Sequence, residues 1–232
     1  MAQGEVTFGD DIAASLAVWK TAPALPLITA ALAILFDLPD VVDPAATLIS
    51  LPAILLLTGF AGTQRIWYLR VFRGRTLARD LVWPMTLAFM GRFIVLGFLV
   101  GIPFALFVVP LLLSVSGVGS RALVTVPLVL VGDFIGTFIT AALAFSTKHV
   151  FEAVSIGWQT LWSGWPATAP YAVVAPLVVI ALGQTLGRTA GGAASVAVEL
   201  VGTLLALLCK GATTAYYLRV HEVGEYGAAA AQ

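Results

Sequence analysis

Polar and charged residues recur along one side of an apolar segment near the end of the chain. Their spacings of three and four residues place them on one face of a helix: Glu199, Thr203, Ala206, Lys210, Thr213 and Tyr217. A second apolar segment carries a smaller stripe of the same kind: Asp133, Gly136, Thr137, Thr140 and Ala144. Ionisable side chains in such segments either mark a solute or proton path or form interhelical pairs.

Asp133 and Lys210 are the natural charge pair between the two stripes. Counted from the outer ends of their segments, they lie roughly 16 Å and 25 Å deep, a gap that long side chains and helix tilt can bridge. Glu199 lies at roughly 9 Å, within reach of Arg188. Two interpretations stay open: a structural pair that holds the two helices together, or part of a transport path.

Recognisable motifs for catalysis or cofactor binding are absent from the sequence. It has no Gly-x-x-x-x-Gly-Lys phosphate loop and no His-Glu-x-x-His zinc pair. The two histidines, His149 and His221, are expected at the cytoplasmic face, and the single cysteine, Cys209, is expected to be a packing residue. We therefore predict no enzyme activity, no cofactor and no metal, with a membrane-embedded lipid-processing enzyme as the third alternative.

The elements that must position these residues are membrane-spanning helices. Of 232 residues, 60% are hydrophobic and 10% charged, with a mean hydropathy of +1.00, which excludes a soluble domain. The apolar runs are continuous and do not alternate, as helical spans require. The 12 basic residues balance 12 acidic ones, so nothing favours nucleic acid. The expected fold class is an all-α polytopic transmembrane bundle.

We predict six spans in one membrane domain, residues 1–232. The spans cover about 21–36, 45–62, 93–113, 122–145, 168–186 and 193–218. Pro23 and Pro26 predict a kink or restart in the first span, and an acidic turn is expected from Asp37 to Pro44. Two interfacial segments are expected at about 77–91 and 149–163, the first of them separated from the third span at Arg92.

Interfacial anchors are predicted at two places. A mixture of cations and aromatic residues follows the second span: Arg65, Trp67, Arg70, Arg73 and Arg75. Residues 149–163 predict an amphipathic helix that lies flat on the cytoplasmic leaflet, with Trp158 and Trp162 at the acyl boundary. Glycine pairs that favour close helix packing are Gly97 with Gly101, Gly132 with Gly136, and Gly183 with Gly187.

The distribution of cations predicts the orientation. With a cytoplasmic N-terminus, most cations lie on or near the cytoplasmic side, whereas Arg121 and Arg188 lie outside and Lys210 lies within the membrane. The cytoplasmic set is Lys20, Arg65, Arg70, Arg73, Arg75, Arg79, Arg92, Lys148 and Arg219. Both termini are therefore expected in the cytoplasm of a bacterial cell, with the protein in its plasma membrane.

Three segments carry a resemblance to a broad group of six-span bacterial proteins. They are 72–77, 144–154 with Trp162 and Trp165 after it, and 215–220. The group includes the YciC-like proteins and the membrane domain of some glycerophosphodiester phosphodiesterases. The resemblance implies a six-helix fold with cytoplasmic ends. It implies no activity, because the group has no agreed one and the hydrolase domain of some members is missing here.

These observations favour a non-enzymatic accessory or scaffold subunit. Its cytoplasmic basic and amphipathic segments would meet anionic lipid, a protein partner or a second copy of the chain. The alternative is a transporter or permease subunit that uses the polar faces of spans four and six.

Overall fold

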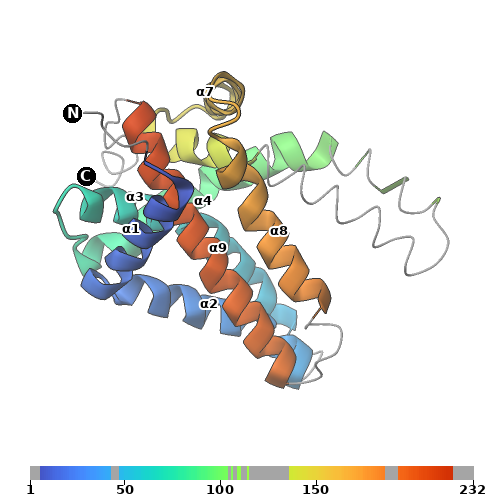
Figure 1. The fold of residues 1–232 in the computed structure, drawn as a ribbon. Coiled ribbons are helices and arrows are strands. Elements are labelled where there is room, and N and C mark those ends of the chain that lie inside the picture. Colours follow the sequence, from blue (N-terminus) through green and yellow to red (C-terminus); the bar gives the residue numbers. More distant parts are fainter. Residues whose placement is uncertain are drawn as a thin grey trace.

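The part of the chain that the structure describes is helical. The computed structural model describes residues 6–42, 47–103, 106, 109–110, 114, 136–185 and 193–221, and no strand occurs among them. The elements are α1 (Phe8–Thr21), α2 (Ala24–Val42), α3 (Thr47–Phe72), α4 (Arg79–Leu96), the π-helical turn η2 (Gly97–Gly101), α7 (Val150–Ser163), α8 (Ala169–Thr185) and α9 (Ala193–Val220) (Figure 1). A further helix, Gly136–Phe145, precedes α7. The predicted all-α class is confirmed.

Two of these helices are long and apolar enough to cross a membrane. They are Arg79–Gly101, which joins α4 to η2, and Val196–Val220 in α9. The pair α1 and α2 adds a third if its two members, bent by 92° at the break between them, count as one span. These lengths are compatible with a membrane protein.

The break between α1 and α2 falls where the prolines predicted it. A capping box begins α1: the Thr7 hydroxyl accepts from the Asp10 backbone N–H, and the Asp10 carboxylate accepts from the Thr7 N–H. The acidic turn expected from Asp37 is wrong for residues 37–42, which continue α2 as helix. Because α2 packs along α3 and α9, tertiary contacts override the weak turn preference of these residues.

Helix α3 continues well past its expected end at Gly62. It stops at Phe72 in a Schellman motif, in which the Arg75 N–H donates to the Arg70 carbonyl at 2.8 Å and the Gly74 N–H to the Val71 carbonyl at 2.9 Å. Gly74 supplies the left-handed conformation that this motif requires, with φ 68°. Residues 63–69 are therefore part of α3, and their side chains are buried in the bundle.

The break expected at Arg92 is also wrong, because α4 runs through it without interruption to Leu96 and on into η2. The Arg92 guanidinium lies 5.5 Å from the centre of the Phe89 ring, a cation–π contact that accommodates the charge on the helix surface. The expected interfacial segment 77–91 and the start of the third span thus form one helix.

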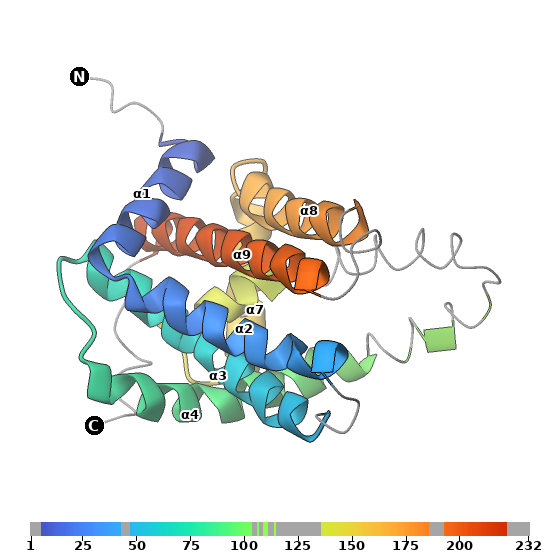
Figure 2. The same ribbon diagram turned by 90° about the horizontal axis from the view of Figure 1, so that it is seen from below.

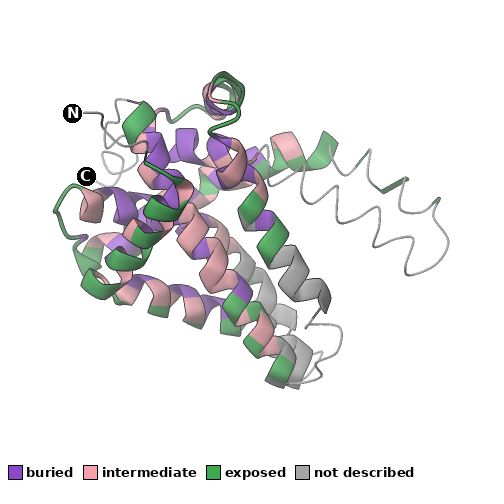
Figure 3. Ribbon diagram, viewed as in Figure 1, coloured by how far each residue is buried: buried purple, intermediate pink, exposed green. Residues whose placement is uncertain are grey.

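Helix α9 lies at the centre of the bundle. It packs against α1, α2, α3 and α8, and α3 also packs against α4 (Figure 2). Buried positions gather in the part of the bundle nearest α7 (Figure 3). The largest fully buried side chains of the described residues include Tyr68, Phe138, Phe145 and Tyr217.

Close helix approaches occur at glycines other than the predicted pairs. A Cβ atom on Gly157 would lie 2.5 Å from the Ile139 backbone, and one on Gly211 would overlap Ser15 and the Tyr68 ring. Of the predicted pairs, Gly97, Gly101 and Gly136 have no atoms within 4 Å of an added Cβ, so they mediate no close packing in the described structure. Gly132 and Gly187 lie outside the described residues.

Candidate functional site: a cavity lined by Arg65 and Lys210

A cavity of about 260 Å³ lies between α3, the Gly136–Phe145 helix, α8 and α9. It is lined by Arg65, Gly136, Thr137, Thr140, Tyr171, Pro176, Ala206, Cys209, Lys210 and Thr213. Six residues of the two predicted stripes therefore line one cavity. Four of them are polar, namely Thr137, Thr140, Lys210 and Thr213, and the other two are Gly136 and Ala206. Two cations contribute to the lining, and none of the described lining residues is acidic.

Arg65 is one of these cations, and its side chain is buried, with 3% of its surface exposed. Its Nη2 donates to the Thr137 carbonyl at 3.0 Å and to the Thr140 hydroxyl at 2.7 Å. Its Nε and Nη1 have no hydrogen-bond partner among the described residues. A buried guanidinium usually has a carboxylate partner, so this arrangement leaves positive charge uncompensated by the described residues.

Lys210 is the second cation, and it is held from α3. Its Nζ donates to Gln64 Oε1 at 2.6 Å, and Gln64 Nε2 donates to the Thr29 hydroxyl of α2 at 2.9 Å. Thr29 in turn donates to the Leu25 carbonyl at 2.9 Å. This chain of hydrogen bonds fixes the lysine on three helices, but every acceptor in it is neutral.

The predicted partner of Lys210, Asp133, lies outside the described residues, so the Asp133 and Lys210 pair stays a prediction. Glu199 is exposed near the other end of α9, and Thr203 is half-buried between them. The structure therefore places the C-terminal part of the α9 stripe, Ala206 to Thr213, at the cavity. Glu199 is not among the lining residues and lies away from it.

The residues of the predicted interfacial anchor after the second span differ in burial: some are buried in the bundle and others are exposed. Arg65 and Trp67 are buried, with 3% and 5% of their surface exposed, so their expected contact with lipid headgroups is wrong. The physical reason is the continuation of α3, which carries both residues back into the bundle. Arg73 and Arg75 are exposed at the end of α3, and Arg70 is half-buried.

Helix α7 carries the predicted aromatic surface. Trp158 and Trp162 are about half exposed and contact each other with ring centres 5.6 Å apart, and Trp165 extends the row. The opposite face packs on the bundle through Ala153, Gly157 and Thr160. Thr160 lies on this packed face, where it is buried and its hydroxyl contacts His221 Nε2 at 2.8 Å.

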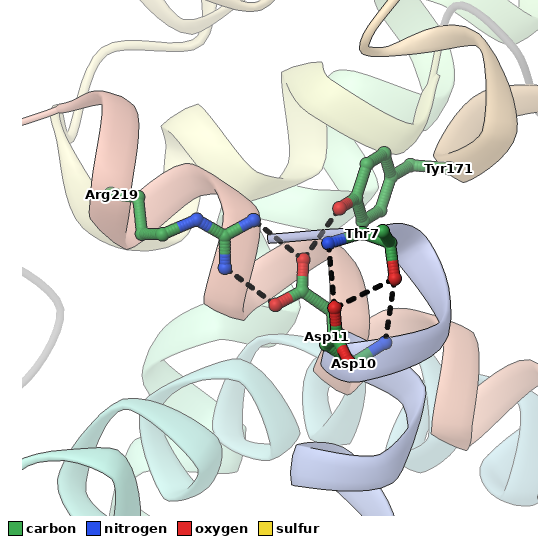
Figure 4. A network of polar contacts seen from close by, with 5 residues as sticks. All are labelled: Thr7, Asp10, Asp11, Tyr171 and Arg219. Carbon is green, nitrogen blue, oxygen red and sulfur yellow. Dashed lines mark hydrogen bonds and ion pairs between the residues drawn. The ribbon is translucent and has the colours of Figure 1, made fainter. Parts of the chain in front are cut away.

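A second polar cluster joins the first and last described helices (Figure 4). The Asp11 carboxylate of α1, 2% exposed, accepts from both terminal nitrogens of Arg219 in α9, at 2.5 and 2.7 Å. The Tyr171 hydroxyl of α8 donates to the same carboxylate at 2.5 Å. The bidentate ion pair joins α1 to α9, and the Tyr171 hydrogen bond adds α8 at the same end of the bundle.

Several of these residues were not predicted from the sequence. Gln64 and Thr29 stand in apolar stretches without a stripe of their own, and Arg65 matched an interfacial pattern. One sequence signal was available: Gly74, a typical helix C-cap, stands nine residues after Arg65 and indicates that the helix extends past it.

No protein-family model matches the chain, and neither a curated protein nor a solved structure matches it significantly. The resemblance to the six-span bacterial group therefore stays a prediction.

Proposed function

We propose that this chain is a polytopic membrane protein that receives a small polar solute in its cavity, as a transporter or permease subunit. The observation that carries this proposal is the placement of Arg65 and Lys210 on one cavity between apolar helices. Charged groups are costly in such surroundings, and those found there commonly serve a solute or ion path.

The proposal includes six spans, cytoplasmic termini and a bacterial plasma membrane. The Asp11 and Arg219 ion pair supports it, because the start of α1 and the end of α9 lie together, as an even number of crossings requires. Reporter fusions after Arg75, near Ser163 and at the C-terminus should report the cytoplasm. Fusions near Asp40, Gly119 and Gly191 should report the outside. A periplasmic signal from the segment 65–79 would contradict this topology.

Cys209 provides a direct test of an accessible cavity, because it is the only cysteine of the chain and lines that cavity. A solute site predicts that a small hydrophilic methanethiosulfonate reagent modifies Cys209 in folded protein within sealed, oriented vesicles. Modification only after unfolding would contradict the proposal and favour a purely structural role for the polar residues. Cys209→Ser protein is the control for labelling at other groups.

A second candidate, an accessory or scaffold subunit, is favoured by the aromatic row on α7. Trp158, Trp162 and Trp165 form a surface of the kind found at membrane interfaces. In a Cys209→Ser background, a spin label at position 158 should lie deeper in the bilayer than one at position 155. Equal depths would contradict an interfacial α7. A partner that co-purifies in mild detergent and is lost when Trp158 and Trp162 become serine would support the accessory role.

A further inference from the structure

We propose that the cavity is an anion site that takes a phosphate group, with Arg65 and Lys210 supplying its positive charge. This inference rests on the proposed solute-binding function and names the class of ligand. A free phosphate compound or the headgroup of an anionic phospholipid presents the same chemistry to the site.

The cavity holds two cations whose described hydrogen-bond partners are all neutral. Arg65 and Lys210 both line it, and their described hydrogen-bond acceptors are a carbonyl, a hydroxyl and an amide oxygen. All three acceptors are neutral. Two cations held in a low-dielectric space repel each other and lose hydration, so an anion between them is stabilised on both counts.

Arg65 and Lys210 both have N–H donors that no described residue accepts from. The Arg65 side chain is buried, and its Nε and Nη1 have no partner in the described part of the chain. An ammonium has three donors, and within the described ranges of the chain Lys210 uses one of them, to Gln64. The Thr140 hydroxyl holds the guanidinium by its other nitrogen, so the arginine is positioned before any ligand arrives.

Charge and size select the ligand class. A phosphate monoester carries about −1.5 to −2 charges near neutral pH, which matches two cations, whereas a carboxylate or chloride leaves one cation uncompensated. The volume of about 260 Å³ lies just below the range of about 300 to 1,000 Å³ typical of pockets for drug-sized ligands. It therefore suits a phosphate group with a small substituent, or a lipid headgroup whose chains leave between the helices.

The rival explanation is a counter-charge from the chain itself. Asp133 precedes Thr137 by four residues in the sequence and was predicted to pair with Lys210. If its carboxylate occupies the site, the cavity is already neutralised and phosphate has no effect.

Protection of Cys209 is the first experiment, carried out on wild-type protein in detergent. Inorganic phosphate, or phosphatidic acid in mixed micelles, should slow modification about ten-fold at about ten times its Kd. Chloride at equal ionic strength and phosphatidylcholine are the controls and should have no effect. Protection by phosphate alone identifies a soluble ligand, and protection by phosphatidic acid alone identifies a lipid. If neither ligand protects Cys209, the phosphate site is wrong. If Cys209 is nevertheless modified in the folded protein, the proposal of an accessible solute cavity is still supported.

A thermal shift provides the second measurement and does not depend on thiol reactivity. At about a hundred times Kd, the effective ligand should raise the Tm of the wild-type protein by about 5 to 10 °C. Lys210→Gln should lose this shift, and Arg92→Gln, which removes a cation outside the cavity, should retain it. Asp133→Asn should retain the shift as well. No shift in wild-type protein, or an equal shift in Lys210→Gln, overturns the proposal. If Lys210→Gln does not fold, the wild-type comparison with chloride decides alone.

Discussion

Asp11 and Arg219 form a two-bonded ion pair across 208 positions of the chain, with the carboxylate buried and the guanidinium about one third exposed. The two partners therefore differ in what each leaves behind when the other is removed. Without its cation, the buried Asp11 carboxylate has no access to water. Without its carboxylate, the partly exposed Arg219 guanidinium can turn towards the solvent.

This asymmetry predicts that Arg219→Gln is more destabilising than Asp11→Asn. We expect a loss of about 3 kcal/mol for the arginine change, and of about 1 to 2 kcal/mol for the aspartate change, which retains a hydrogen-bonding group. Thermal or denaturant unfolding in detergent measures both. Asp10→Asn, at the exposed neighbouring position, retains a side-chain oxygen for the capping box and should cost clearly less stability than either main variant. Equal losses for the two main variants would contradict the difference in burial.

Tyr68 links α1, α3 and α9 through its hydroxyl. It accepts from the Trp19 indole N–H at 2.7 Å and donates to the Leu207 carbonyl at 3.1 Å. Tyr68→Phe leaves the half-buried Trp19 indole N–H and the Leu207 carbonyl without their partner, so we expect a loss of about 1 to 2 kcal/mol in unfolding free energy.

Tyr216→Phe is the matched control for this change. Tyr216 is also buried, but its hydroxyl has no hydrogen-bond partner among the described residues. Its replacement should change stability by less than about 0.5 kcal/mol. If both tyrosines respond equally, the loss in Tyr68→Phe does not come from these two hydrogen bonds.

Close packing of α7 on the bundle predicts a contrast between two glycines. In Gly157→Ala the new methyl group meets the Ile139 backbone at 2.5 Å, and backbone has little freedom to move. We expect a loss of about 1 to 3 kcal/mol. In Gly91→Ala the methyl group enters open space on α4, so the gain in helix propensity should raise stability by up to about 1 kcal/mol. Melting curves of the two variants, run side by side, test this difference in sign.

His221, just beyond the end of α9, predicts a pH dependence. Burial lowers its pKa from the usual 6.5, and its Nε2 contacts the Thr160 hydroxyl at 2.8 Å. The unfolded chain therefore binds this proton more readily than the folded one. Its contribution to stability is complete above pH 6.5 and is lost as the pH falls through the lowered pKa. The Tm of wild-type protein should fall more steeply below that pH than the Tm of His221→Gln. Parallel curves for the two proteins would exclude the histidine as the cause.

Helical periodicity was sufficient to predict the aromatic row on α7 and the C-terminal part of the polar stripe on α9, from Ala206 to Thr213. Both depend on spacings within one helix, as do Thr137 and Thr140 in the segment before α7. The break after Thr21 was equally local, because proline removes the donors that would continue the helix.

Partners across the bundle were not predictable in the same way. Nothing in the local sequence links Gln64 to Lys210 or Asp11 to Arg219, since each contact depends on how two distant helices pack. Arg65 was misinterpreted because cations beside aromatic residues are typical of a membrane interface. Whether such residues face headgroups or the bundle depends on where the helix ends, and α3 ends at Phe72, after two more turns.

The packing of α1 against α9 also has a consequence in time. Translation at about 5 to 20 residues per second needs about 10 to 40 s to produce the 208 positions between Asp11 and Arg219. During that interval α1 exists without its final neighbour, and the carboxylate of Asp11 has to remain hydrated. Helix α1 can therefore dock onto α9 only after the ribosome has made α9.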